Sequence, residues 1–599
     1  MLKIPFQYKK INIDEVKGPE RKRAKHTAAT MKRIGSYLLE EKWLLTLVIV
    51  MVITSSGLGL LGPYLVGMAI DDFIVTKKLE GLALLLVILI IIYAIYSLAI
   101  FLQNYWMIGI GQKIVYTLRK QLFEKFHLLP ISYFDKRQQG ELMSRVTNDI
   151  DNINNTLNQS VIQIFSSTIT LIGTVTVMLI LSPVLTAITM TIIPLLFIGM
   201  RIITKRTGPL YKIQQKDLGE LNGYVEEIVS GQHIVTAYSQ EGRVIFEFEK
   251  RNKQLQHSGF WSQTIAGFIP KVMNGLNFLS FALIALFGGL LAIKGHITIG
   301  VIVIFIEYAR QFTRPLNELS NQFNILLSAV AGAERVFNVF DEEEEARDEK
   351  NAVPLKDVEG RFTFRNVTFS YEETPVLQQI SFDVNPGQTV ALVGHTGAGK
   401  TTLVQIISRF YDYDSGSVLL DGVELQQIKR SSLRNEMGFV LQDTFLFEGT
   451  VRENIRYGKL DATDEEVIAA AKNANAHSFI ERLPNGYDTL LEDNGSMLSQ
   501  GQKQLLTIAR AMISNPAILV LDEATSNIDT ITEIKIQEGL RRLMAGRTSF
   551  VIAHRLNTIK QADIILLLEH GKIIERGTHE ELMQKRGKYF ALYSSHETA

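Results

Sequence analysis

Long apolar runs without charge are the feature that most constrains how the first half of this 599-residue chain can fold. Residues Trp43 to Ile70 contain no charged side chain, and neither do residues Leu82 to Phe101. At 1.5 Å per residue, about 20 apolar residues in a helix cross the roughly 30 Å hydrocarbon layer of a bilayer. Each run is therefore long enough to span a membrane as a single helix.

The same test finds further spans downstream. Val161 to Ile203 is interrupted at Ser182-Pro183 and is long enough for two spans joined by a tight turn. Another pair runs from Val272 to Ile293 and from Ile297 to about Gln311, with a short polar turn between them. The sequence thus predicts six spans within its first 320 residues. Buried helices of a soluble protein, the alternative, rarely supply so many such runs.

The distribution of Lys and Arg predicts how these spans are oriented. If the N-terminus is cytosolic, the outer loops hold only three lysines. The inner segments then hold eleven basic residues in 1–42, seven in 105–160 and eight in 204–267. Since positive residues accumulate on the cytosolic side, we expect the N-terminus and everything after the sixth span to be cytosolic. Residues 1–42 also lack the apolar core of a signal peptide.

Composition excludes several classes of function. The formal net charge is zero, and the mean hydropathy is +0.12, which argues against a nucleic-acid partner and for contact with a lipid bilayer. The chain has no cysteine, so it has no disulfide framework, thiolate zinc site or cysteine nucleophile. Its length exceeds what one hydrophobic core usually organises, so we expect at least two domains.

A glycine-rich loop in the second half predicts a phosphate-binding site. Gly394 to Thr401 follows the apolar run Thr389–Val393 and precedes a helix-like run from Thr402 to Ile407. In this order the glycines let backbone N–H groups surround phosphate oxygens, and the helix adds the positive end of its dipole. The predicted nucleotide contacts are Gly394, His395, Thr396, Gly397, Ala398, Gly399, Lys400, Thr401 and Thr402. Lys400 should reach the β- and γ-phosphates, and Thr401 should bind Mg²⁺.

Two later motifs complete this chemistry. The run Ile518–Leu521 is typical of a buried strand and ends in Asp522 and Glu523. Asp522 suits the Mg²⁺ shell, while Glu523 can orient or deprotonate the water that attacks the γ-phosphate. Structural carboxylates at a strand end are the weaker alternative. Leu498 to Gln502 precedes a helix-like run and predicts a second anion site at a helix N-terminus.

Three polar segments link these parts. Gly140–Asp151 and Glu226–Tyr238, in the two long inner segments, are predicted as short helices that lie against a partner surface. Solvated helical hairpins are the alternative for both. The acidic run Asp341–Glu345 is interpreted as a solvated linker without chemistry.

The fold class predicted is multidomain: an all-α six-helix transmembrane domain followed by an α/β P-loop nucleotide-binding domain. Residues 1–42 form a cytosolic basic N-terminal segment and elbow, and residues 43–332 form the six-span transmembrane domain with long cytosolic helical extensions. Residues 333–354 are the acidic linker, and residues 355–599 are the nucleotide-binding domain.

With these motifs in this order, nearly the whole chain resembles an ATP-binding cassette (ABC) exporter of the multidrug or lipid-exporting type, with membrane and nucleotide-binding domains fused. The resemblance implies that Tyr371 stacks on adenine and that Gln442, in Phe439–Asp443, couples Mg²⁺ to the membrane helices. It also implies that Asp529, in Ser526–Asp529, belongs to the D-loop. His554 matches the switch histidine that contacts the γ-phosphate.

The resemblance further implies a dimer, because each ATP lies between the P-loop of one chain and the signature of the other. This chain donates Ser499, Gln500, Gly501 and Gln502 as its signature. Gln500 stands where the family has glycine, and Glu492–Met497 follows the family pattern only loosely. A side chain at position 500 crowds a phosphate contact, which favours a heterodimer with a sister chain over the possible homodimer.

The expected function is ATP-driven export of a hydrophobic or amphipathic compound, a drug or a lipid, across the cell membrane by alternating access, with ATP and Mg²⁺ as cofactors. An ATP-gated channel on the same scaffold and a homodimeric lipid flippase are the alternatives. A soluble ATPase acting on proteins or DNA is disfavoured by the spans. Glu307, near the inner half of the sixth span, either lines a cavity or pairs with Arg310.

Overall fold

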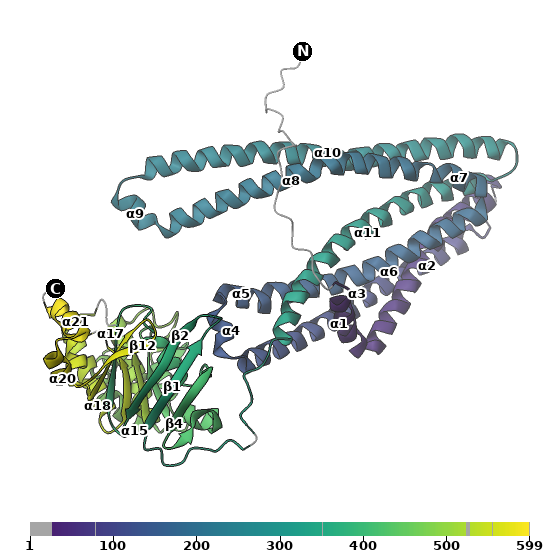
Figure 1. Cartoon of the computed structure of the whole chain (residues 1–599). Coiled ribbons are helices and arrows are strands. Elements are labelled where there is room, and N and C mark those ends of the chain that lie inside the picture. Colours follow the sequence, from purple (N-terminus) through teal and green to yellow (C-terminus); the bar gives the residue numbers. More distant parts are fainter. Residues whose placement is uncertain (1–26, 78–79, 350, 523–527, 554, 598–599) are drawn as a thin grey trace. The chain divides into compact units, whose positions relative to one another are not determined.

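The computed structural model describes residues 27–77, 80–349, 351–522, 528–553 and 555–597. Its contacts divide the chain into two units (Figure 1). The helical unit contains residues up to His127 together with Gln139–Glu342. The cassette unit contains Leu128–Gln138 together with the residues from Glu343 onward. A short piece of the first inner segment therefore belongs with the nucleotide-binding part of the chain.

The helical unit is built from long helices (Figure 1). They are α1 (Thr27–Glu40), α2 (Lys42–Ala69), α3 (Leu82–Leu128), α5 (Gln139–Ser144), α6 (Ile150–Leu181), α7 (Pro183–Met190), α8 (Ile192–Ser230), α9 (Gln232–Ala237), α10 (Glu241–Ile293) and α11 (Ile299–Phe340), with π-helical turns η2 (Ile70–Val75) and η3 (Arg145–Asp149). The predicted tight turn lies between α6 and α7. There the Ser182 side chain accepts a hydrogen bond from the Leu185 N–H, and Pro183 occupies the first turn of α7.

Four helical stretches within the described residues are long and apolar enough to cross a membrane. They are Lys42–Val75, Leu82–Leu128, Gln139–Leu181 and Glu241–Ile293, and they contain the predicted first, second, third and fifth spans. The fourth predicted span falls on α7 and the start of α8, where the apolar helix Pro183–Leu195 is shorter. The sixth falls on α11, in which Glu307 and Arg310 interrupt the apolar run. The total of six spans stays a prediction.

The two predicted short inner helices lie in the helical unit. In the first segment, α5 and η3 cover most of Gly140–Asp151, and the buried Asp149 carboxylate accepts a 2.9 Å hydrogen bond from Arg335 Nε of α11. In the second, α8 ends at Ser230 and α9 follows. The segment that groups with the cassette is instead Leu128–Gln138, which contains the short helix α4 (Ile131–Asp135).

In its described residues, the cassette unit contains three sheets. The strands are β1 (Phe362–Ser370), β2 (Pro375–Val384), β3 (Thr389–Val393), β4 (Ser415–Leu420), β5 (Val423–Glu424), β6 (Met437–Val440), β7 (Gly449–Thr450), β8 (Leu490–Leu491), β9 (Ile518–Asp522), β10 (Thr548–Ile552), β11 (Ile564–Glu569) and β12 (Lys572–Gly577). The six-stranded sheet has the order β12-β11-β3-β10-β9-β6 and is parallel except at β12. An antiparallel sheet has the order β2-β1-β4-β5, and β7 pairs with β8.

The cassette unit also contains helices. They are α12 (Lys400–Ile407), α13 (Arg430–Asn435), α14 (Val451–Arg456), α15 (Asp464–Asn473), α16 (His477–Ile480), α17 (Gln500–Ser514), α18 (Thr530–Met544), α19 (Leu556–Gln561), α20 (His579–Lys585) and α21 (Lys588–Glu597), with 3₁₀ turns η4 (Leu425–Gln427) and η5 (Gly486–Asp488). Leu392, Val520 and Phe550, on three central strands of the six-stranded sheet, are fully buried. A helical transmembrane region followed by an α/β nucleotide-binding domain is therefore the fold, as the sequence predicts.

Candidate functional site

One edge of the six-stranded sheet brings the predicted nucleotide motifs together. Because the central strands are parallel, their carboxyl ends lie at the same edge. Ile552, the last residue of β10, pairs with both Leu392 of β3 and Asp522 of β9. Val440, the last residue of β6, pairs with Leu521 of β9. The P-loop after β3, Asp522 at the end of β9 and the segment after β6 that holds Gln442 therefore lie at the same edge, which is where ligands bind in open α/β sheets.

The P-loop leads into a helix whose N-terminus has no side-chain cap. Gly397 and Gly399 have φ angles of +82° and +103°, in the region that favours glycine. A Cβ on Gly399 would lie 2.7 Å from Leu377 Cδ2. Since no side chain caps α12, its first N–H groups are available to an anion. This loop geometry fits the phosphates of ATP.

Lys400 lies inside this loop with 8% of its surface exposed. Its Nζ donates to the carbonyl oxygens of Gly394 (2.7 Å) and His395 (3.1 Å), two residues at the start of the loop. Burial lowers the pKa of Lys400, and the charge of Asp522 opposes that shift. The ammonium group is thus directed across the P-loop and is close enough to Asp522 to be affected by its charge.

Tyr371, the predicted adenine platform, is hydrogen-bonded to α12. Its hydroxyl is 3.2 Å from Thr402 Oγ1 and donates to Gln405 Oε1, both on α12. Its ring meets Phe369 edge-on, with centroids 4.9 Å apart. Burial raises the pKa of the phenol, yet 36% of the residue is exposed, so part of the ring is open to a ligand.

The signature segment is organised differently. The side chain of Ser499 accepts from the Gln502 N–H (3.3 Å), and Gln502 Oε1 accepts from the Ser499 N–H (2.9 Å), which forms a capping box on α17. Gln500 Nε2 donates to Thr444 Oγ1 at 3.3 Å. Gly501 is buried against α18. The unusual Gln500 side chain therefore bonds the segment that follows Gln442.

The remaining predicted site residues are Asp529, Thr401, Gln442, Glu523 and His554. Asp529 caps α18, because its carboxylate accepts from the Thr532 N–H at 2.9 Å, and these hydrogen bonds lower its pKa. Thr401 and Gln442 are described and exposed, but Glu523 and His554 lie outside the described residues. Within the part of the chain that the structure describes, no cluster of three His, Cys, Asp or Glu side chains suits a metal ion.

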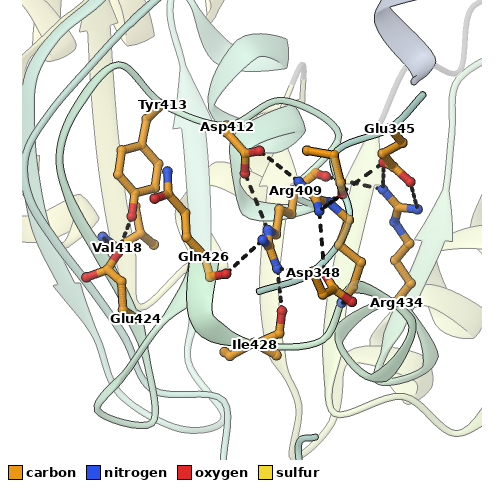
Figure 2. A network of polar contacts seen from close by, with 12 residues as sticks. Glu345, Asp348, Arg409, Asp412, Tyr413, Val418, Glu424, Gln426, Ile428 and Arg434 are labelled. Atoms are coloured by element: carbon orange, nitrogen blue, oxygen red, sulfur yellow. Dashed lines mark hydrogen bonds and ion pairs between the residues drawn. The ribbon is translucent and has the colours of Figure 1, made fainter. Parts of the chain in front are cut away.

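The acidic linker makes contacts that the sequence did not predict (Figure 2). The run is exposed at Asp341, Glu343 and Glu344, as predicted. At its end, however, Glu345 binds Arg434 at 2.6 Å, and Asp348 lies 3.4 Å from Arg430 and 3.5 Å from Arg409. The Glu345 and Asp348 side chains are only about a quarter exposed, at 28% and 27%. The linker is therefore bound to the cassette.

Tyr411 is a second residue that the sequence did not single out. It lies two positions after Arg409, contacts the Tyr371 ring and donates to Asp135 of α4. The available signal was the run Arg409–Tyr413, which contains three aromatic and two charged residues.

For Glu307, the sequence left open a place in a cavity lining or an ion pair with Arg310, and the structure contains the ion pair. Arg310 Nη1 lies 3.3 Å from Glu307 Oε1, one turn along α11. Both side chains are well exposed within the helical unit, at 66% and 44%. Glu307 therefore has an ion-pair partner on its own helix.

A helical membrane region joined to a P-loop nucleotide-binding domain is the class that this fold and site define. Two family models match the chain: the ABC transporter transmembrane region over residues 45–316 and the ABC transporter domain over residues 377–526. The chain belongs to the ABC transporter family.

Curated relatives match along most of their length. The uncharacterized ABC transporter ATP-binding protein YfiC of Bacillus subtilis (strain 168) is 58% identical over 593 residues, 99% of this chain and 98% of the relative. A fatty acid ABC transporter ATP-binding/permease protein of Mycobacterium tuberculosis (strain CDC 1551 / Oshkosh) is 42% identical over 522 residues, 87% and 82% of the two chains. An ATP-dependent lipid A-core flippase of Syntrophus aciditrophicus (strain SB) is 38% identical over 530 residues, 88% of each.

The family fixes the general activity. The chain is a multi-pass plasma-membrane half-transporter with a cytosolic ATP-binding domain, and it couples ATP hydrolysis to export. Half-transporters of this family work as dimers in the lipid bilayer.

Proposed function

We propose that this chain exports hydrophobic or amphipathic compounds, lipids in particular, as one half of a heterodimer that binds Mg²⁺·ATP. The observation that carries the proposal is the edge of the parallel sheet, where the uncapped α12 N-terminus, Lys400 and Asp522 meet. In this arrangement Thr401, Gln442 and Asp522 would hold Mg²⁺, which supplies positive charge to the phosphates.

Hydrolysis is assigned to Glu523, with His554 at the γ-phosphate. Glu523 directly follows the Asp522 that ends β9, so its place in the chain suits a base beside the attacking water. Glu523→Gln should keep ATP binding but lower turnover by about 100-fold or more, because an amide cannot act as a base. ATPase assays and nucleotide-binding measurements on the purified dimer test this. Turnover within a few fold of the parent would remove Glu523 from the mechanism.

A polar seam between α6 and α11 supports an amphipathic substrate. Its contacts are Ser160 with Gln322 (2.6 Å), Ser167 with Glu318 (3.3 Å), Arg314 with Glu318 (2.8 Å) and Gln163 with Glu318. Gln163 and Ser167 lie in the third predicted span, where polar groups are costly and commonly mark a substrate path. Their partner Glu318 lies on α11 just beyond the inner end of the sixth predicted span. The Arg314 side chain is 82% exposed, so its guanidinium can meet an anionic headgroup while the neighbouring surface holds an acyl chain.

The substrate proposal is tested with matched lipids in proteoliposomes. Arg314→Gln should lower transport of a fatty acid about 10-fold and leave its uncharged methyl ester unchanged, since only the acid pairs with the guanidinium. Arg310→Gln is the control, because Arg310 pairs with Glu307 and lies outside the seam. An equal loss for acid and ester would exclude headgroup recognition by Arg314.

The heterodimer proposal follows from the difference between the two halves of the site. The P-loop has every residue that phosphate binding needs, whereas the donated signature carries Gln500 in place of glycine. A sister chain with a standard signature would complete the Glu523 site, and Gln500 would serve the sister's site. The test is to express this chain alone. Weak ATPase activity restored by a co-expressed partner supports the proposal, and full activity as a stable homodimer contradicts it.

A further inference from the structure

Tyr411 connects two parts of the cassette unit that are far apart in sequence. Its hydroxyl donates to Asp135 Oδ2 at 2.8 Å, and Asp135 is the last residue of α4. Its ring meets the Tyr371 ring edge-on, with centroids 5.1 Å apart and planes at 88°. Phe369 packs against both rings. A single side chain thus touches α4, from the inner segment between the second and third predicted spans, and the proposed adenine platform.

The backbone on either side of Tyr411 is firmly held. Arg409, 5% exposed, donates to the carbonyl oxygen of Gln426 at 2.8 Å and to that of Ile428 (Figure 2). Asp412 accepts from Arg409 Nε at 3.3 Å and from Arg430 at 2.8 Å. These side-chain bonds hold the loop at Arg409 and Asp412, and the hydrogen bond to Asp135 holds the Tyr411 side chain in the orientation that reaches α4.

The charge of Asp135 also affects the phenols of both Tyr371 and Tyr411. Burial is the main cause that raises the pKa of both the Tyr371 and the Tyr411 phenols, and the charge of Asp135 raises each further. The Asp135 carboxylate is therefore near enough to act on both hydroxyls, although it bonds only that of Tyr411 among the contacts described.

We propose that Tyr411 is a positioning residue through which the docking of α4 sets the orientation of the Tyr371 ring. This inference rests on the proposed role of Tyr371 at adenine. While Asp135 holds the Tyr411 hydroxyl, the Tyr411 ring supports Tyr371 from its edge. When that hydrogen bond is lost, the supporting ring can turn, and the platform holds adenine less well. Hydrolysis of ATP that is already bound is unaffected, because Tyr411 has no place in that chemistry.

The experiment measures ATPase activity against nucleotide concentration for the purified dimer in lipid. Tyr411→Phe and Asp135→Ala should each raise KM for ATP about 3- to 10-fold and leave kcat within about twofold, as expected for one lost hydrogen bond. The double variant should match the single variants, since all three lose the same bond. Asp135→Asn should keep a KM near that of the parent, because its amide oxygen can still accept.

Tyr413→Phe is the matched control. Tyr413 lies in the same loop, and its hydroxyl bonds Glu424 rather than α4 (Figure 2). The KM of Tyr413→Phe for ATP should therefore equal that of the parent. An unchanged KM in Tyr411→Phe, or additive effects in the double variant, would overturn the proposal. Tyr371→Ala distinguishes failure of the proposed adenine site from failure of the proposed coupling between Tyr411 and Tyr371. If it raises KM and Tyr411→Phe does not, only the coupling is wrong, whereas no effect of Tyr371→Ala overturns the adenine site as well.

Discussion

Two helix N-termini in the cassette, those of α12 and α17, are both candidate phosphate sites, and their hydrogen bonding differs. The start of α12 has no side-chain cap and is preceded by glycines with positive φ. The start of α17 is closed by the reciprocal Ser499 and Gln502 bonds. An uncapped N-terminus is ready for an anion, while a capped one must give up internal hydrogen bonds first. We therefore propose that the α12 site binds nucleotide in one chain and that the α17 site contributes only when a second chain brings a phosphate to it.

The largest effect that tests this contrast is expected at Lys400. Lys400→Ala should abolish detectable binding of a fluorescent ATP analogue to the chain and lower ATPase activity of the dimer by at least about 100-fold, because a buried charged donor to phosphate is lost. Lys472→Ala, an exposed lysine on α15, is the control. Retained nucleotide binding in Lys400→Ala would show that the α12 site does not depend on this side chain.

A smaller and selective effect is expected at Ser499. Ser499→Ala removes the cap of α17, which should cost the cassette about 1 kcal/mol of unfolding free energy. ATP binding to the same chain's P-loop should be unchanged. Hydrolysis by the dimer should fall about 10-fold, since one hydrogen bond to a charged phosphate is lost. If Ser499→Ala weakened ATP binding to a chain without its partner, the distinction between the α12 and α17 sites would be wrong, because Ser499 would then act in the α12 site.

The smallest effect is expected at Gln500. In the proposed heterodimer, Gln500→Gly acts on the sister chain's site, so total ATPase activity should stay within about twofold of the parent. Within this chain, the variant loses the hydrogen bond to Thr444. A several-fold rise in activity would instead mean that position 500 faces the productive site, as it does in a homodimer.

Local sequence order was enough to predict the α12 half of the site. A strand, a glycine loop and a helix fix the phosphate cradle within about 20 residues, and Asp522 ends β9 as predicted. The contact of Gln500 with Thr444 bridges 56 positions, and that of Tyr411 with Asp135 bridges 276. Neither has a local pattern, because tertiary packing alone brings the partners together.

The membrane part shows the same limit. Runs without charge predicted the helices around Trp43–Ile70 and Leu82–Phe101, since hydrophobicity and length alone decide them. The sixth predicted span mixes apolar residues with Glu307 and Arg310, so composition identifies it less sharply. The acidic linker was predicted in part, for another reason: charge predicts solvation, but three arginines from separate positions in the cassette pair with Glu345 and Asp348.

The docked linker also shortens the connection between α11 and the cassette. Arg33 of α1 holds Asp341 at 2.8 Å, directly after α11 ends at Phe340, and Arg434 holds Glu345. Only Glu342–Glu344 separates these two anchors. Four steps of extended chain cover at most about 14 Å. The chain between these two anchors can therefore take up only a short displacement before one of the ion pairs must break.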